Sequence, residues 1–119
     1  VHALNRGTKG LGVRFFATSS GREPVREWLE GLDRSAMIAV STDLRTVQFG
    51  WPLGMPLVRK LEVALWEVRS RVPSGTVRML FTLLNGEIVL LHAFTKKSQL
   101  LPREELALAR KRMREVHRG

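Results

Sequence analysis

Residues 65–95 read LWEVRSRVPSGTVRMLFTLLNGEIVLLHAFT, and this stretch decides the fold. Its opening run, LWEVRSRV, alternates apolar and polar residues with the two-residue period of a half-buried strand. Residues 76–84 and 87–95 are apolar at nearly every position, which is typical of strands buried on both faces. Asn85-Gly86 between them is a strong signal for a two-residue hairpin. We therefore expect three successive antiparallel strands, with the last two in the centre of a sheet.

Another strand and two helices are expected before this stretch. The alternating run GVRFFATS predicts a strand over residues 13–18. Pro24 suits the first turn of a short helix that Gly31 ends. Asp33 suits the N-cap of a second helix, whose apolar residues recur at helical spacing until residue 50. These two helices should form a hairpin.

The chain ends in a further predicted helix, which Pro102 opens. Two acidic residues follow this proline and arginines gather towards the other end, as the helix dipole prefers. The order β–α–α–β–β–β–α predicts an α+β fold, a twisted antiparallel sheet packed by an N-terminal helical hairpin, plus a C-terminal helix. We expect one domain over residues 13–119, preceded by a flexible basic leader over residues 1–12.

Composition limits the classes of function. The chain has 119 residues, a formal net charge of +9 and no cysteine. The lack of cysteine excludes disulfides, thiolate-bound metals and thiol nucleophiles, and it fits a reducing cytoplasm. No apolar run reaches the ~20 residues that a membrane span needs, so we expect no membrane partner. The charge instead favours an anionic partner, either nucleic acid or an acidic protein surface.

The positive charge gathers on the predicted sheet, since acidic residues outnumber basic ones only in residues 23–58. Arg69 and Arg71 project from one face of their strand because strands have a period of two. Arg78 follows across a short turn, so a hairpin would bring three guanidinium groups together. Three arginines that face one way favour a bound anion, whose oxygens the planar guanidinium can contact in pairs. A solvated basic face is the alternative interpretation.

Other candidate groups are few. His92 is the only mid-chain group that titrates near neutrality, although a mid-strand histidine is more often a hydrogen-bonded core residue. Glu67 shares the face of Arg69 and Arg71, and we expect it to neutralise one arginine rather than to act as a general base. The histidines stand far apart in sequence, and no P-loop, Rossmann or nucleophile-elbow motif is present. We therefore expect no metal and no cofactor.

Three segments stand in an order and spacing that point to a family. They are the LWE-hydrophobic-Arg strand at residues 65–69, the next strand with Arg78, and the HAFTKK run at residues 92–97 before a Pro-led helix. In these segments the chain resembles the RelE/ParE superfamily, the toxins of type II toxin–antitoxin modules, and most closely its HigB-like, phage-associated branch. The similarity covers about residues 13–115.

The resemblance implies a microbial-ribonuclease-like fold and a metal-independent endoribonuclease, an mRNA interferase that cleaves messages on the ribosome and so inhibits translation. The ribose 2′-hydroxyl would attack the adjacent phosphorus and leave a 2′,3′-cyclic phosphate and a free 5′-hydroxyl. By position, the catalytic residues would be Arg69, Arg71, Arg78 and His92. The RNA-binding residues would be Arg59, Lys60, Lys96 and Lys97.

The resemblance also implies partners, namely mRNA, the ribosome and a cognate antitoxin, often a helix-turn-helix protein in this branch. Many relatives use tyrosines for stacking or proton transfer, whereas this chain has no tyrosine and carries Val77 and Phe81 in the corresponding strand. Two alternatives therefore stay open. One is a ParE-like inhibitor that binds DNA gyrase and cleaves nothing, and the other is a catalytically inactive RNA-binding module.

Overall fold

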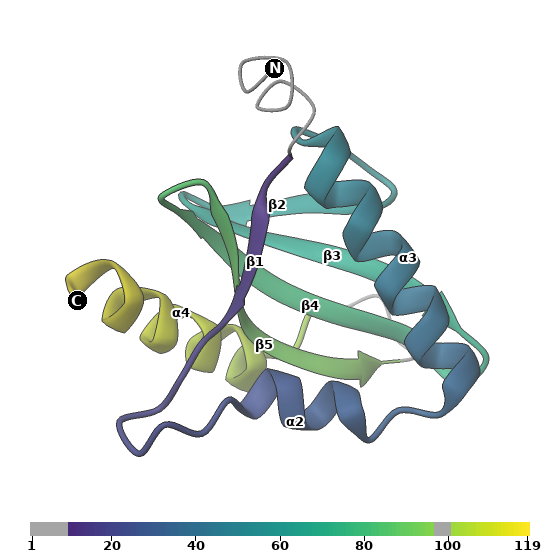
Figure 1. The fold of residues 1–119 in the computed structure, drawn as a ribbon, viewed down its shortest axis with the longest axis horizontal. Coiled ribbons are helices and arrows are strands. Elements are labelled where there is room, and N and C mark those ends of the chain that lie inside the picture. Colours follow the sequence, from purple (N-terminus) through teal and green to yellow (C-terminus); the bar gives the residue numbers. More distant parts are fainter. Residues whose placement is uncertain (1–9, 97–100) are drawn as a thin grey trace, which may run out of the picture.

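The computed structural model describes residues 10–96 and 101–119, and a five-stranded sheet forms its centre (Figure 1). In chain order the elements are β1 (Gly12–Phe15), α2 (Pro24–Glu30), α3 (Arg34–Gly50), β2 (Val58–Glu62), β3 (Leu65–Val72), β4 (Gly75–Leu84), β5 (Glu87–Lys96) and α4 (Arg103–Arg118). Most of the predicted basic leader, residues 1–9, lies outside the described residues. The predicted α+β class is confirmed.

The three strands from β3 to β5 form as predicted, and they occupy the middle of the sheet order β1-β5-β4-β3-β2. Asn85 and Gly86 both have positive φ, at 52° and 77°, which is the geometry of the hairpin turn that this dipeptide favours. Most residues of β4 and β5 are buried on both faces. Burial on both faces explains why the apolar residues of these two strands are consecutive and do not alternate with polar ones.

The helical hairpin also forms where the sequence predicts it. Pro24 opens α2 and Gly31 caps its end. The Asp33 carboxylate accepts a hydrogen bond from the backbone N–H of Ala36 at 2.8 Å, which caps α3 and lowers the pKa of Asp33. α3 runs on to Gly50.

Two details of the predicted sheet are wrong. The expected fully antiparallel arrangement is mixed instead, because β1 pairs with β5 in parallel. The sequence also predicted no strand at β2, which pairs antiparallel with β3. β2 is a short edge strand with a register shift between Lys60 and Glu62, so its apolar residues do not alternate regularly. Ala64, with a φ of 62°, lies in the turn that follows β2 and carries no turn signature.

β1 is also shorter than predicted, since it ends at Phe15 and not at residue 18. The backbone N–H of Thr18 donates to the carbonyl of Arg22, and the N–H of Gly21 donates to the carbonyl of Thr18. This turn takes the chain away from the sheet and towards α2.

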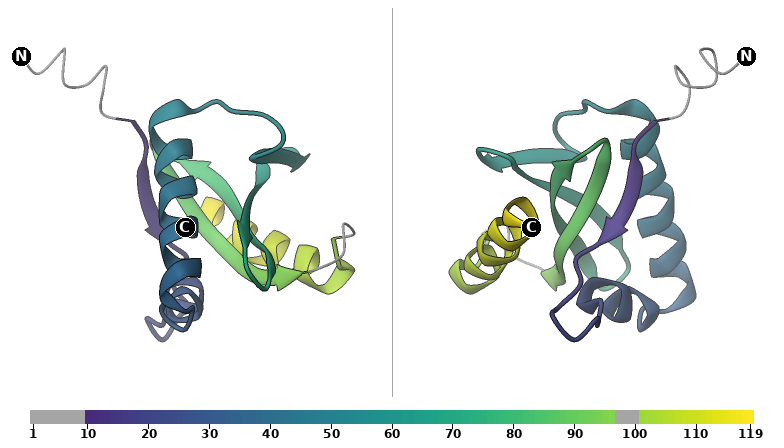
Figure 2. Two further views of the ribbon diagram at one scale, coloured as in Figure 1. Left: turned by 90° about the vertical axis from the view of Figure 1, so that its right-hand side faces the viewer. Right: turned by 60° about the vertical axis from the view of Figure 1, so that its left-hand side comes forward.

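The sheet is covered on both faces, and in Figure 2 it separates α3 from α4. On the α3 face, Val47 packs in one apolar cluster with residues such as Val68 and Phe81. On the α4 face, Ala109 packs in a second cluster with residues such as Leu65 and Leu80. No helix among the described residues is long and apolar enough to span a membrane.

Candidate functional site

Polar side chains form rows across the α4 face of the sheet. Residues opposite each other on neighbouring strands point to the same face. The rows, read from β3 through β4 to β5, are Glu67–Leu80–His92, Arg69–Arg78–Phe94 and Arg71–Thr76–Lys96. β2 adds Arg59 opposite Glu67. The topology therefore brings together basic residues that four different strands supply.

Glu67 is the buried centre of a charged cluster with Arg59, Arg69 and Arg78. Its side chain has an exposed fraction of 0%. Glu67 Oε1 lies 3.3 Å from Arg59 Nε and 3.8 Å from Arg69 Nε, and Glu67 Oε2 lies 3.6 Å from Arg78 Nη1. One carboxylate thus faces three guanidinium groups, where the sequence predicted that it would neutralise one. The cluster keeps a net positive charge.

Arg78 is the deepest of the three arginines, with 1% of its side chain exposed. Burial lowers its pKa, the Glu67 carboxylate raises it, and the positive charges of Arg69 and Arg59 lower it further. The guanidinium of arginine nevertheless stays protonated at neutral pH. Arg78 is therefore a fixed positive charge beneath the surface.

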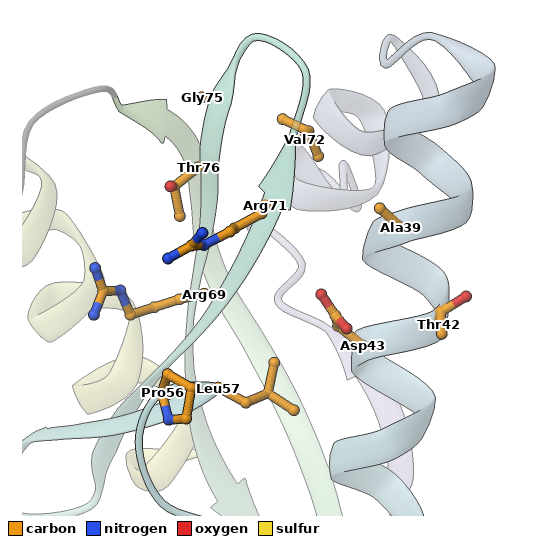
Figure 3. A pocket seen from close by; sticks show the side chains of 10 residues that line it. All are labelled: Ala39, Thr42, Asp43, Pro56, Leu57, Arg69, Arg71, Val72, Gly75 and Thr76. Carbon is orange, nitrogen blue, oxygen red and sulfur yellow. The ribbon is translucent and has the colours of Figure 1, made fainter.

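A pocket of about 780 Å³ opens beside this cluster, where β3 continues past the end of β2. The pairing of β2 with β3 reaches Val68, and the N–H of Arg69 then donates to the carbonyl of Leu57. Arg69 and Arg71 line the pocket from β3, and Figure 3 shows them pointing to the same side of the strand. Arg69 thus contributes to both the charged cluster and the pocket.

The opposite wall of the pocket comes from α3 and contains Asp43 and Thr42 (Figure 3). The hydroxyl of the buried Ser70 donates a hydrogen bond to the Asp43 carboxylate. This bond fixes α3 against β3 and so holds the two walls at a set separation.

The structure does not bring all of the predicted site residues together. Lys60 lies opposite Trp66, so it points to the α3 face and away from Arg59. Lys96 lies in the row of Arg71, at the end of β5. Lys97 is outside the described residues.

His92 lies on the α4 face but is engaged elsewhere. Its Nε2 pairs with the Glu105 carboxylate of α4, and its ring stacks on Phe94 with 5.6 Å between centroids. It lines a separate cavity of about 160 Å³ together with Trp28 and Arg112. His92 is thus not among the described residues that line the larger pocket, and its role in proton transfer stays a prediction.

Asp43 in the pocket wall and Thr76 contribute to this site but are not among the residues that the sequence predicts. Arg59 is a predicted RNA-binding residue, but its contact with Glu67 depends on a strand that the sequence does not predict. Asp43 reaches the site through the packing of α3, for which the sequence has no local signal. Thr76 could have been found, because it opens the predicted strand directly after the turn.

The arrangement suits an anion. Three arginines around a single carboxylate leave excess positive charge, and Arg69 and Arg71 present donors to an open pocket. No group of three or more metal-ligating side chains comes together within residues 10–96 and 101–119. A phosphate group with oxygens on several sides matches the donors present.

Comparison with known protein families gives a match over most of the chain. Residues 27–114 match the family described as Phage derived protein Gp49-like (DUF891). The match spans most of the chain, from α2 to α4, and it includes every residue of the charged cluster. No curated protein matches the chain.

Proposed function

Since the chain belongs to the phage-derived Gp49-like family, a toxin-like family related to RelE and HigB, we propose that it is the toxin of a type II toxin–antitoxin pair and an mRNA-cleaving endoribonuclease. In this proposal it belongs to the HigB-like branch and cleaves messages during translation in the cytoplasm. Its partner would be a cognate antitoxin, of the helix-turn-helix type that this branch often uses.

One observation carries the proposal. Arg69 and Arg71 line an open pocket on one strand face, and the buried Arg78 and the partly exposed Arg59 add positive potential beside them. Only one carboxylate, that of Glu67, takes part in these ion pairs among the described residues. The β3 wall of the pocket, which faces the Asp43 carboxylate of α3, therefore offers fixed positive charge to a polyanionic chain.

Cleavage by this site would be mainly electrostatic. The 2′-hydroxyl of the RNA gives up its proton as its oxygen attacks the adjacent phosphorus. The bond from phosphorus to the 5′-oxygen breaks and this oxygen takes up a proton, while negative charge builds up on the non-bridging phosphate oxygens. Guanidinium groups held in place before the reaction stabilise this charge without reorganising. Arg69 and Arg71 would contact these oxygens, Lys96 would hold the flanking backbone, and His92 remains the candidate for proton transfer.

The test is to express the protein and map RNA 5′-hydroxyl ends with active ribosomes and with ribosomes stalled by an inhibitor, while plasmid supercoiling is followed. New ends confined to translated messages are the expected result. Loss of supercoiling with intact RNA would instead identify a ParE-like gyrase inhibitor. Intact RNA with unchanged supercoiling would identify an inactive RNA-binding module.

The variant Arg71→Gln tests whether RNA is cleaved at this pocket. Arg71 is exposed, so its loss should leave the fold intact and reduce cleavage by about tenfold or more, the value of one charged hydrogen bond. The matched control is Arg45→Gln, which removes the same charge from an exposed position of α3 outside the pocket lining. Equal cleavage by the two variants would contradict the placement of the site.

A further inference from the structure

We infer that Glu67 is a positioning residue, whose buried carboxylate fixes the guanidinium of Arg69 at the pocket wall and so sets where a phosphate is held. The inference deepens the proposed function and rests on it, because it concerns how the same site holds an RNA phosphate group. It goes beyond the simple neutralisation of one arginine that the sequence predicted.

The first support is the burial of Glu67. A carboxylate with no exposed surface loses its hydration, and interactions within the protein must offset this cost. Its compensating partners are the guanidinium groups of Arg59, Arg69 and Arg78. They come from β2, β3 and β4, so one carboxylate forms ion pairs with charged side chains from three strands.

The second support is the position of Arg69 between the cluster and the pocket. Its Nε lies 3.8 Å from Glu67 Oε1, while its side chain, 17% exposed, also lines the pocket. Arg78 stands directly opposite it on β4, and Arg59 stands opposite Glu67 on β2. The positive charges of Arg78 and Arg59 repel Arg69, and the carboxylate of Glu67 opposes this repulsion. Removing the carboxylate should therefore shift the guanidinium of Arg69, because Arg78 is too deeply buried to move away.

The alternative is that Glu67 only balances charge, and this role predicts a different effect of Glu67→Gln on the rate of RNA cleavage. Removing a negative charge makes the pocket more positive, which strengthens RNA binding. If Glu67 only balanced charge, Glu67→Gln would therefore bind RNA more tightly and cleave it at least as fast. If Glu67 positions Arg69, the same variant keeps its RNA affinity and loses cleavage rate, because misplaced groups no longer match the transition state.

The experiment measures kcat and RNA affinity for wild type, Glu67→Gln and the double variant Arg59→Gln/Glu67→Gln. The double variant restores the net charge of the wild-type cluster without restoring its central carboxylate. For Glu67→Gln we expect a kcat lower by on the order of 100-fold and an affinity equal to or above that of wild type. The double variant should stay as slow as Glu67→Gln. A wild-type kcat in either variant would overturn the inference.

The variant Glu67→Asp provides a second test of the inference if Glu67→Gln does not fold. Aspartate keeps the charge but is shorter by one methylene, so it cannot reach all three guanidinium groups at their present separations. We expect a folded protein with normal RNA affinity and a reduced kcat. Full cleavage by Glu67→Asp would show that charge alone suffices, and it would overturn the positioning role.

A readout that needs no cleavage separates this inference from the proposed function. NMR of the Arg69 Nε–Hε group, with inorganic phosphate as the probe, should show a side chain that is more mobile in Glu67→Gln than in wild type. An Arg69 side chain that is no more mobile in Glu67→Gln than in wild type would overturn the inference even if wild type cleaves RNA. Conversely, a wild type that never cleaves RNA would overturn the proposed function while the NMR comparison still decides the role of Glu67.

Discussion

At the residue scale, the three arginines that the sequence groups together differ in how deeply their side chains are buried. Arg71 is exposed, Arg69 is partly buried, and Arg78 is almost completely buried. A buried guanidinium contributes fixed charge and stability, whereas an exposed one can contact a ligand directly. The three residues therefore have different roles, even though they stand on one face of one hairpin.

The burial of Arg78 leads to a prediction about stability. Arg78→Met should lower the free energy of unfolding by about 3 kcal/mol, because Glu67 loses one of its cations inside the protein. For a domain of this size, that loss corresponds to a melting temperature lower by roughly 10 °C. Thermal denaturation followed by circular dichroism measures it.

The matched control is Arg71→Met, in which the same side chain is replaced at an exposed position. Its unfolding free energy should stay within about 0.5 kcal/mol of wild type. If both variants melt together with wild type, the ion pair of Arg78 with Glu67 adds no net stability.

At the element scale, the two long helices are attached to the sheet in different ways. α3 buries Val40 and Val47 in the larger apolar cluster. In α4 the buried residue is Ala109, partly buried residues such as Leu106 and Met113 pack around it, and polar contacts supplement them. The Arg110 guanidinium donates to both oxygens of Glu62 at 2.8–2.9 Å. The attachment of α4 should therefore depend more on pH than that of α3.

Glu62 provides the test of this dependence. The hydrogen bonds from Arg110 hold the pKa of Glu62 below its ordinary value. A carboxyl whose pKa is lowered by folding stabilises the protein above its unfolded pKa, about 4.3, and loses this contribution as the pH falls through the lower, folded pKa. The stability of wild type should thus fall more between pH 7 and acid than that of Glu62→Gln.

Urea denaturation of both proteins across this pH range measures the difference. The other carboxyls with lowered pKa, such as Glu27 and Asp33, are common to both proteins and cancel in the comparison. The effect should be small, because both partners of the Glu62–Arg110 pair are partly exposed. Parallel pH profiles would show that this pair does not attach α4.

At the scale of the whole molecule, charge is divided between surfaces. The segment that contains α2 and α3, residues 23–58, is net acidic, while the basic residues of β3, β4 and β5 gather on the α4 face. A surface of this kind attracts a polyanion by releasing its counterions. RNA binding should therefore weaken steeply with salt.

The slope of this salt dependence reports how many phosphate contacts the protein makes. With Arg69, Arg71 and Lys96 on phosphates, the logarithm of the RNA binding constant should fall with the logarithm of salt concentration at a slope of about −2, at about −0.7 per contact. Arg71→Gln should reduce the slope by about 0.7, and Arg45→Gln should leave it unchanged. Fluorescence anisotropy with a short single-stranded RNA measures both. Equal slopes in the two variants would argue against a phosphate contact by Arg71.

Much of the fold follows from local signals in the sequence. The capping residue Asp33, the Asn85-Gly86 turn and the alternation along β3 each act within a few residues, so they predict α3, the β4–β5 hairpin and the shared face of Arg69 and Arg71. The sequence does not predict β2, because this strand is stabilised by pairing with β3 and its own residues do not alternate between apolar and polar.

The sequence by itself determined the α+β class, the order of most elements and the set of basic residues from which a site could form, because spacing and turn chemistry are local properties of the chain. The tertiary structure decided which of these residues meet. Strand register placed Arg59 beside Glu67, and packing buried Arg78 while it left Arg71 exposed. Register and depth depend on contacts between residues far apart in sequence, and only the complete fold fixes the free energy of those contacts.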